Sequence, residues 1–318
     1  MGTRAVTTRR SFLAVAGLGA AAVAVDAASG HRPQRAVGRL VHAAGGPGER
    51  PAAAPPPGTR PAAVRLVAAP ATVDLGGRRV RTWTFNGELP GPELRLRVGE
   101  LLRARLENRL PAGTTVHWHG IALPNPMDGV PGLTQPLVEP GQGFDYEFRL
   151  PDPGTYFYHP HVGLQIDRGL YGPLVVEDPH EVVRYDREAV LLLDDWTHGI
   201  GPSPEAALAR LQQGGMHHAG HAGAHHHHGG GEAATFDPTS PLGADAGDIP
   251  YPLYLVNGRP PRDPAVLKAR PGERIRLRII NPAADTAFRL ALGGHRLRVT
   301  HADGYPICPV TGDALLIA

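Results

Sequence analysis

Two His-X-His pairs are the residues of this 318-residue sequence best suited to bind a metal. The first is His117-Trp118-His119, and the second, which begins 42 residues later, is His159-Pro160-His161. In a β-strand, residues i and i+2 point to the same side, so each pair presents two imidazoles to one place. If the two strands or their ends lie side by side, four imidazole nitrogens converge. Such a set suits copper or zinc, and it contains no thiolate.

Chance is the main alternative for one His-X-His pair in a β-protein, but here two pairs lie inside highly patterned segments. A zinc hydrolase built on the same pairs is disfavoured because no Glu accompanies them in a recognisable base position. If the pairs do bind metal, we expect the four imidazoles to converge at one end of a sandwich and to face outward. Their ring nitrogens should then lie mostly within about 8 Å of one another.

The patterned segments around the pairs resemble the first-domain signatures of the multicopper oxidases, the family of laccases, cuprous oxidases and bilirubin oxidases. The segments are residues 117–121, 124–135, 153–165 and 168–174. A weaker resemblance continues through Asn281 and the segment from His301 to Pro306. In all, the resemblance covers residues 65–318.

This resemblance implies a chain of cupredoxin β-sandwiches and a trinuclear copper cluster, with one type 2 copper and a type 3 pair. His117 would ligate the type 2 copper, and the type 3 ligands would be His119, His159 and His161. The implied activity is an oxidation of Cu(I), phenols or similar one-electron donors, coupled to the four-electron reduction of O2 to water. Asp128 occupies the position of the acid that passes protons in related enzymes, although a turn cap is the alternative role.

The sequence also departs from the family. Complete members carry a His-Pro-X-His-X-His segment and a His-Cys-His segment, which supply the other cluster ligands and the type 1 copper cysteine, and neither occurs here. The single cysteine, Cys308, lies between Ile307 and Pro309, and we expect a buried, inert thiol. The prediction is therefore half of the trinuclear ligand set, with type 1 copper in a missing C-terminal domain. The alternative function is a non-catalytic fragment that binds and sequesters copper.

Composition favours strands that could position these ligands, because 41 Gly and 34 Pro separate short apolar runs. The runs fall into a first set and a second set: 79–85, 94–98, 101–106, 144–150 and 174–177, then 254–256, 275–280, 288–292 and 297–300. We expect an all-β fold of tandem cupredoxin-like Greek-key sandwiches, the second one incomplete.

The two sets look like copies of one another. Asn86-Gly87 in the first set corresponds to Asn257-Gly258 in the second, and Met127-Asp128-Gly129 corresponds to Ala302-Asp303-Gly304. Where the first copy has its first histidine pair, the second has Ala287-Phe288-Arg289-Leu290. We therefore expect the second domain to bind no metal and to present an apolar or Arg-bearing surface there.

The predicted organisation is a twin-arginine-type signal peptide at 1–28, a Pro/Ala/Gly-rich linker at 29–62, and domains at 63–180 and 186–318. The signal is read from Arg9-Arg10 and the short apolar stretch that follows, which is too short for a comfortable membrane span. It predicts export across the cytoplasmic membrane, to the periplasm, the cell surface or the medium, with no span after cleavage. An ordinary secretory signal is the alternative.

A His-rich insertion at 211–248 interrupts the second domain. Seven histidines between 217 and 228 could bind copper or zinc, and a solvated loop without a role is an equal alternative. The net charge of +2 includes a basic N-terminal region, so the remaining chain is mildly acidic. This remaining chain has no basic cluster, and nucleic acid is excluded as a partner.

Overall fold

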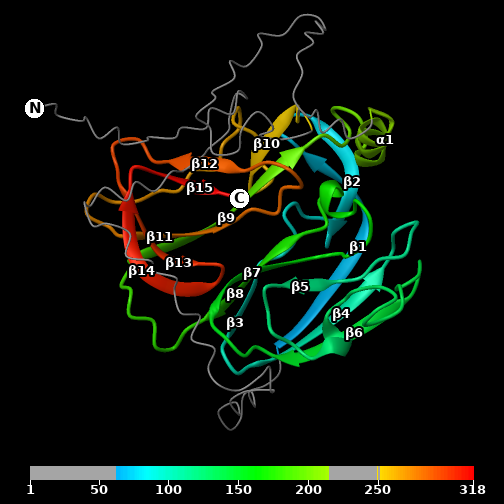
Figure 1. Cartoon of the computed structure of the whole chain (residues 1–318), viewed down its shortest axis with the longest axis horizontal. Helices are drawn as coiled ribbons and strands as arrows, with labels where there is room; N and C mark the ends of the chain where they lie inside the picture. Colours follow the sequence, from blue (N-terminus) through cyan, green and yellow to red (C-terminus); the bar gives the residue numbers. More distant parts are fainter. Residues whose placement is uncertain (1–61, 215–248, 250) are drawn as a thin grey trace, which may run out of the picture.

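The computed structural model describes residues 62–214, 249 and 251–318, which form two β-domains lying side by side (Figure 1). The all-β prediction is confirmed. The predicted signal peptide, nearly all of the predicted linker and most of the His-rich insertion lie outside the described residues. In the described part of the chain, no helix is long and apolar enough to cross a membrane.

The first domain consists of two four-stranded sheets that face each other across a common core. One sheet has the order β2-β1-β4-β6, and the other has the order β3-β8-β7-β5. The strands of the first are β1 (Ala62–Asp74), β2 (Arg79–Phe85), β4 (Leu101–Asn108) and β6 (Gly143–Arg149). Those of the second are β3 (Leu94–Arg97), β8 (Gly172–Glu177), β7 (Gly154–His159) and β5 (His117–His119).

Alternation of apolar and polar residues places one face of most strands in this core, whereas β8 is buried on both faces. In β4, for example, Leu102, Ala104 and Leu106 are buried, whereas the arginines between them are exposed. Burial of such side chains contributes roughly 1.5–3 kcal/mol for each large aliphatic residue. This burial stabilises the sandwich, whose end carries the first histidine pair on β5.

The second domain is built from shorter sheets. A three-stranded sheet has the order β10-β9-β11, and β12 pairs with β15 while β13 pairs with β14. The strands are β9 (Arg187–Trp196), β10 (Leu253–Val256), β11 (Ile275–Ile280), β12 (Phe288–Ala291), β13 (Leu297–Ala302), β14 (Tyr305–Gly312) and β15 (Ala314–Ile317). Three short helices complete the described residues: η1 (Asn125–Met127), η2 (Ile166–Arg168) and α1 (Pro204–Gly214).

The predicted duplication is visible in corresponding strands and in one asparagine of each copy. β1 pairs antiparallel with β2 and parallel with β4, and β9 pairs in the same way with β10 and β11. Asn86 accepts a hydrogen bond from the Val67 amide, and Asn257 accepts one from the Leu192 amide, each at a positive φ. The correspondence between Asp128 and Asp303 is looser, since Asp128 has φ −72° and Asp303 has φ 49°.

The two domains share an apolar and ionic interface. Tyr171 of the first domain packs with Leu192 and Ile280 of the second. Close by, Arg278 of β11 donates to the Thr155 hydroxyl of β7 at 2.9 Å and forms a 2.7 Å ion pair with Glu188. The second domain therefore supports β7, the strand that ends at His159.

Three details of the second domain differ from the sequence-based expectations. Cys308 is exposed rather than buried, because within the described residues its strand, β14, pairs only with β13 and its faces stay uncovered. Phe288 is buried rather than part of a surface, because it packs edge-on against Tyr254. Helix α1 extends four residues, 211–214, into the segment predicted as an insertion.

Candidate metal centre

Strands β5 and β7 position the two histidine pairs by pairing with each other at the edge of a sheet. The ladder is antiparallel and sets His117 opposite His159, Trp118 opposite Tyr158, and His119 opposite Phe157. The two pairs, 42 residues apart in sequence, are thus brought to one end of the first sandwich. His161 follows β7 by two residues and completes the group.

Trp118, between the two histidines of the first pair, anchors β5 in the core. Its side chain is fully buried and packs against Tyr146, Phe148 and Tyr158, with ring centroids 5.2–6.0 Å apart. Because neighbouring side chains of a strand point to opposite sides, burial of the indole directs both histidines away from the core.

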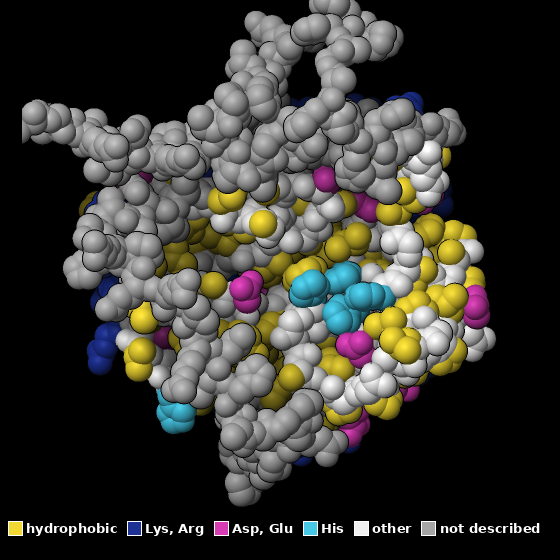
Figure 2. Space-filling view, in the orientation of Figure 1, with side chains coloured by type: hydrophobic (Ala, Val, Ile, Leu, Met, Phe, Trp, Pro, Cys, Tyr) yellow, Lys and Arg dark blue, Asp and Glu magenta, His cyan; other side chains and the backbone are white. Residues whose placement is uncertain are grey.

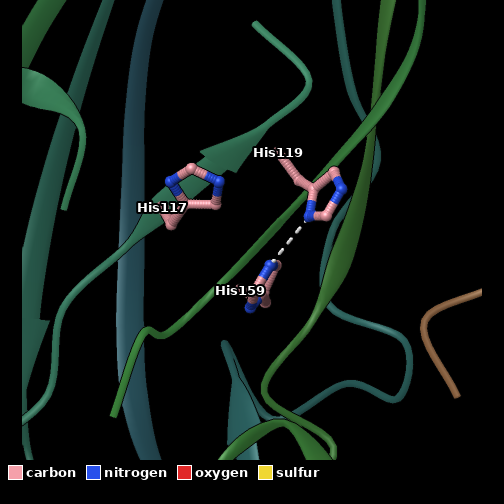
Figure 3. Close-up of side chains that lie close together, drawn as sticks. All are labelled: His117, His119 and His159. Carbon is pink, nitrogen blue, oxygen red and sulfur yellow. Dashed lines mark hydrogen bonds between the residues drawn. The ribbon is translucent and has the colours of Figure 1, made fainter. Parts of the chain in front are cut away.

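The four imidazoles gather in one patch that is open to solvent, over β5 and β7 (Figure 2). The ring centroid of His117 lies 5.7 Å from that of His119, 5.4 Å from that of His159 and 4.4 Å from that of His161. One ring nitrogen from each of His117, His119 and His159 lies within 4.8 Å of the others (Figure 3). The expected convergence and outward orientation are therefore present.

Asp128 fixes the ring of His117 from the loop after η1. The Nδ1 atom of His117 lies 2.8 Å from the backbone carbonyl oxygen of Asp128 and 3.3 Å from its carboxylate. Donation of the Nδ1 hydrogen to this carbonyl leaves Nε2 with a free lone pair, which is the form of imidazole that binds metals. The Asp128 amide also caps η1 by donating to Asn125.

Gly129 allows that loop to approach β5. It has φ +81°, and a Cβ atom there would lie 2.0 Å from the Val116 carbonyl oxygen, so a side chain cannot be accommodated without displacing backbone. In the sequence, Gly129 is noted only as part of the segment Met127-Asp128-Gly129 that the second copy repeats. The orienting group for His117 is a backbone carbonyl, for which the sequence carries no direct signal.

Burial disfavours the charged form of three of the imidazoles, those of His119, His159 and His161. Burial, the largest cause, and the charges of the neighbouring histidines together lower the pKa of His159 to about 3, against the opposing effect of its hydrogen bond to the Pro160 carbonyl. Burial, followed by the charge of His117, also lowers the pKa values of His119 and His161. Neutral imidazoles are the state required of metal ligands at neutral pH.

Family models of the multicopper oxidases match residues 67–181 and 187–318. The chain belongs to the multicopper oxidase family. It is 50% identical over 252 residues to the multicopper oxidase MmcO of Mycobacterium tuberculosis, an alignment that covers 79% of this chain and 49% of that protein. It is 39% identical to copper resistance protein A of Pseudomonas syringae, over 77% of this chain and 42% of that protein.

Among solved structures, a multicopper oxidase from Pseudomonas thermotolerans superposes with a TM-score of 0.62 at 33% identity. This superposition covers 81% of this chain and 55% of that one. The fold is accordingly cupredoxin-like, as in other multicopper oxidases. The chain spans about half or less of the length of these two curated relatives.

Membership in the multicopper oxidase family implies copper as cofactor, and the donor set fits that metal. Imidazole–metal bonds of about 2.0–2.1 Å put two ligands of one ion within about 4 Å of each other. The 4.8 Å limit on the three nitrogen atoms is close to this separation. Neutral imidazoles suit copper and zinc alike, so the ring geometry is compatible with a metal site, and membership in the family points to copper.

Proposed function

We propose that the four imidazoles form one half of the ligand set of a trinuclear copper cluster in a multicopper oxidase. His117 would hold the type 2 copper, and the type 3 ligands would be His119, His159 and His161. The cluster would supply electrons to O2 in quick succession, so that water is the product. The observation that carries this proposal is the convergence of two His-X-His pairs across one strand ladder.

The open side of the site supports the idea of a half-set. His119 and His161 are exposed, while His117 and His159 are partly buried against the end of the sandwich. Figure 2 shows the imidazole patch at the surface with nothing of the described chain across it. Further ligands would approach from this side, and the type 1 copper would belong to the same further part of the protein.

Asp128 would have two roles in this function. Its carbonyl oxygen orients His117, as the 2.8 Å contact indicates, and its carboxylate remains partly exposed beside the imidazoles. A carboxylate in that position can pick up a proton from solvent and release it toward the metal site. The turn-capping role uses the backbone amide, so it does not compete with proton transfer by the side chain.

The electron donor in this proposal is Cu(I), a phenol or a similar small one-electron reductant, and O2 is the oxidant. The similarity to a copper resistance protein favours Cu(I) among these donors. The location in this proposal is outside the cytoplasm, after twin-arginine export.

A titration with Cu(II) tests the metal site directly. The full chain would carry Ser in place of the seven histidines between 217 and 228, so that they do not bind copper themselves. His159→Ala should lose most of the tight Cu(II) binding, because it removes one of the three imidazoles whose nitrogen atoms lie within 4.8 Å of one another. His295→Ala is the control, since His295 lies on an exposed turn and its imidazole contacts the nearby Gly293 carbonyl. Equal affinity in the two variants would contradict the proposal.

A specific observation also favours the second candidate, a copper-binding protein without oxidase activity. The only cysteine, Cys308, has no histidine neighbour in sequence and is exposed on β14. Electron entry through a type 1 copper therefore has no ligand set within these 318 residues. Tight copper binding by the chain without O2 consumption would support this second function for the chain alone.

A further inference from the structure

His161 is the one imidazole of the group that the strand ladder does not hold. β7 ends at His159, and Pro160 has no amide hydrogen with which to extend the pairing. The ring of His161 nevertheless lies closer to His117 than any other ring of the group does, at 4.4 Å between centroids. Something other than sheet pairing must therefore keep this residue in place.

A hydrogen bond from the segment before β5 reaches the backbone of His161. The amide of His161 donates to the Thr115 hydroxyl at 3.3 Å. Thr115 is fully buried and lies two residues before His117. Its hydroxyl thus links the backbone of one proposed ligand to the strand that carries another.

Gln165 makes a second link between the same two segments. Its Nε2 donates to the Gly113 carbonyl oxygen at 2.8 Å, and its Oε1 accepts from the Thr114 hydroxyl at 2.7 Å. The side chains of Thr114 and Gln165 are buried, so both ends of the Gln165 amide are satisfied where water is excluded. A buried polar group left without such a partner costs about 1–3 kcal/mol, so these bonds favour one arrangement over others.

Both segments are themselves rigid. Thr114 exchanges two backbone hydrogen bonds of 3.0 Å with Val138, which fixes the segment before β5. The backbone amide of Gln165 donates to the Val162 carbonyl oxygen, and this bond closes the turn after His161. Gln165 then leads directly into η2.

We propose that Thr114, Thr115 and Gln165 form a clasp that positions His161 against His117 as metal ligands. These are positioning residues, because none of them is itself a ligand. The clasp rests on the proposed copper site, and it adds three residues that no histidine motif identifies. A clasp that served only stability would affect unfolding and leave the metal site unchanged.

Thr115→Val tests the clasp because valine keeps the shape of threonine and removes the hydroxyl. Thr84→Val is the matched control: Thr84 is equally buried in a strand of the same domain, and its hydroxyl has no hydrogen-bond partner among the described residues. Both variants would be made in the full chain with Ser in place of the seven histidines between 217 and 228. The probe is Cu(II) alone, and the measurements are its affinity for each variant and the electron paramagnetic resonance spectrum of the bound ion.

We expect Thr115→Val to bind Cu(II) roughly 10–100-fold more weakly and with an altered spectrum, as for other residues that orient metal ligands. Thr84→Val should have the Cu(II) affinity and spectrum of the unmodified chain, and so should Thr115→Ser, which keeps the hydroxyl. If Thr115→Val fails to fold, Gln165→Met decides, since it removes the amide with little change in volume. Unchanged affinity and spectrum in a folded variant would overturn the clasp, whereas absence of Cu(II) binding by the unmodified chain would overturn the copper site itself.

Discussion

The backbone carbonyl oxygen of Asp128 lies 2.8 Å from Nδ1 of His117, so the loop after η1 determines which ring nitrogen faces the other imidazoles. This relationship depends on the close approach of Gly129 to the Val116 carbonyl. A side chain at residue 129 would push the loop away and release the His117 ring.

Gly129→Ala should therefore weaken both the fold and copper binding. Gly132→Ala is the control, because Gly132 has a similar positive φ but open space around its Cβ position. The control should lose about 1–2 kcal/mol of unfolding free energy from its backbone conformation alone. Gly129→Ala should lose roughly 1–3 kcal/mol more, through displaced backbone, and at least about tenfold in Cu(II) affinity. Denaturant unfolding and Cu(II) titration measure these effects, and similar losses in the two variants would contradict the argument.

The part of this site that could be predicted from sequence is the part that strand periodicity positions, and the part that single tertiary contacts position could not be predicted. The period of two in a strand predicted that His117 and His119 face one way, and the ladder to β7 bears this out. The Asp128 carbonyl and the Thr115 hydroxyl act through particular three-dimensional contacts, and residue spacing gives no sign of them. The copper roles of the four histidines stay a prediction.

In the fold, too, local patterns predicted some features, whereas others depend on tertiary contacts. The alternating runs predicted most strands, whereas β1 was missed because its sequence is rich in alanine and contains Pro70. The structure accommodates this strand by a change of partner: residues up to Ala68 pair with β4, and residues from Ala68 onward pair with β2. The burial of Phe288 and the exposure of Cys308 depend on which strands cover them, which a local pattern does not specify.

Glu188 should be essential to the interface between the domains. The Glu188 side chain is 12% exposed, and its carboxylate lies 2.7 Å from the guanidinium of Arg278 and 2.8 Å from that of Arg95. Because Arg95 belongs to the first domain and Arg278 to the second, these two ion pairs join strands of both domains. Glu188→Gln would leave the buried Arg278 without its counter-charge, at a cost of about 3–5 kcal/mol, whereas Arg95 would keep its ion pair with Glu93.

Glu147→Gln is the control for this change. Glu147 pairs with Arg103 at 2.7 Å, but both side chains are about half exposed, and such pairs contribute about 0–1 kcal/mol. Denaturant unfolding of both variants would compare them. A loss below about 1 kcal/mol for Glu188→Gln would mean that packing alone holds the interface.

Asp167 should make the stability depend on pH in a defined direction. Burial, and then the charge of Asp195, raise the pKa of Asp167 to about 6, above its usual value near 4. Between these values the folded state binds more protons than the unfolded state. The contribution of Asp167 to stability is therefore fully present at low pH and is lost as pH rises through about 6.

Asp167→Asn should remove this loss and raise the unfolding free energy at neutral pH by about 1–3 kcal/mol, with little gain near about pH 4. Asp313→Asn is a suitable control, because Asp313 is highly exposed and forms an ion pair with the exposed Arg296. The measurement is the difference in unfolding free energy between variant and unmodified chain across this pH range. A gain of the same size at both ends of the range would show that the carboxylate charge of Asp167 is not the cause.

The copper-loaded chain should lack the intense blue colour of a type 1 centre. That colour requires a copper–thiolate bond in a site with two histidines, and Cys308 is an exposed residue on β14 between Ile307 and Pro309. Copper held by the imidazoles at β5 and β7 should give only weak visible bands, and Cys308→Ser should leave the absorption spectrum and the Cu(II) stoichiometry unchanged. Visible spectroscopy with O2-consumption measurements tests both statements. An intense blue preparation that loses its colour in Cys308→Ser would show that this cysteine binds copper, and O2 turnover by that preparation would extend the activity to the chain alone.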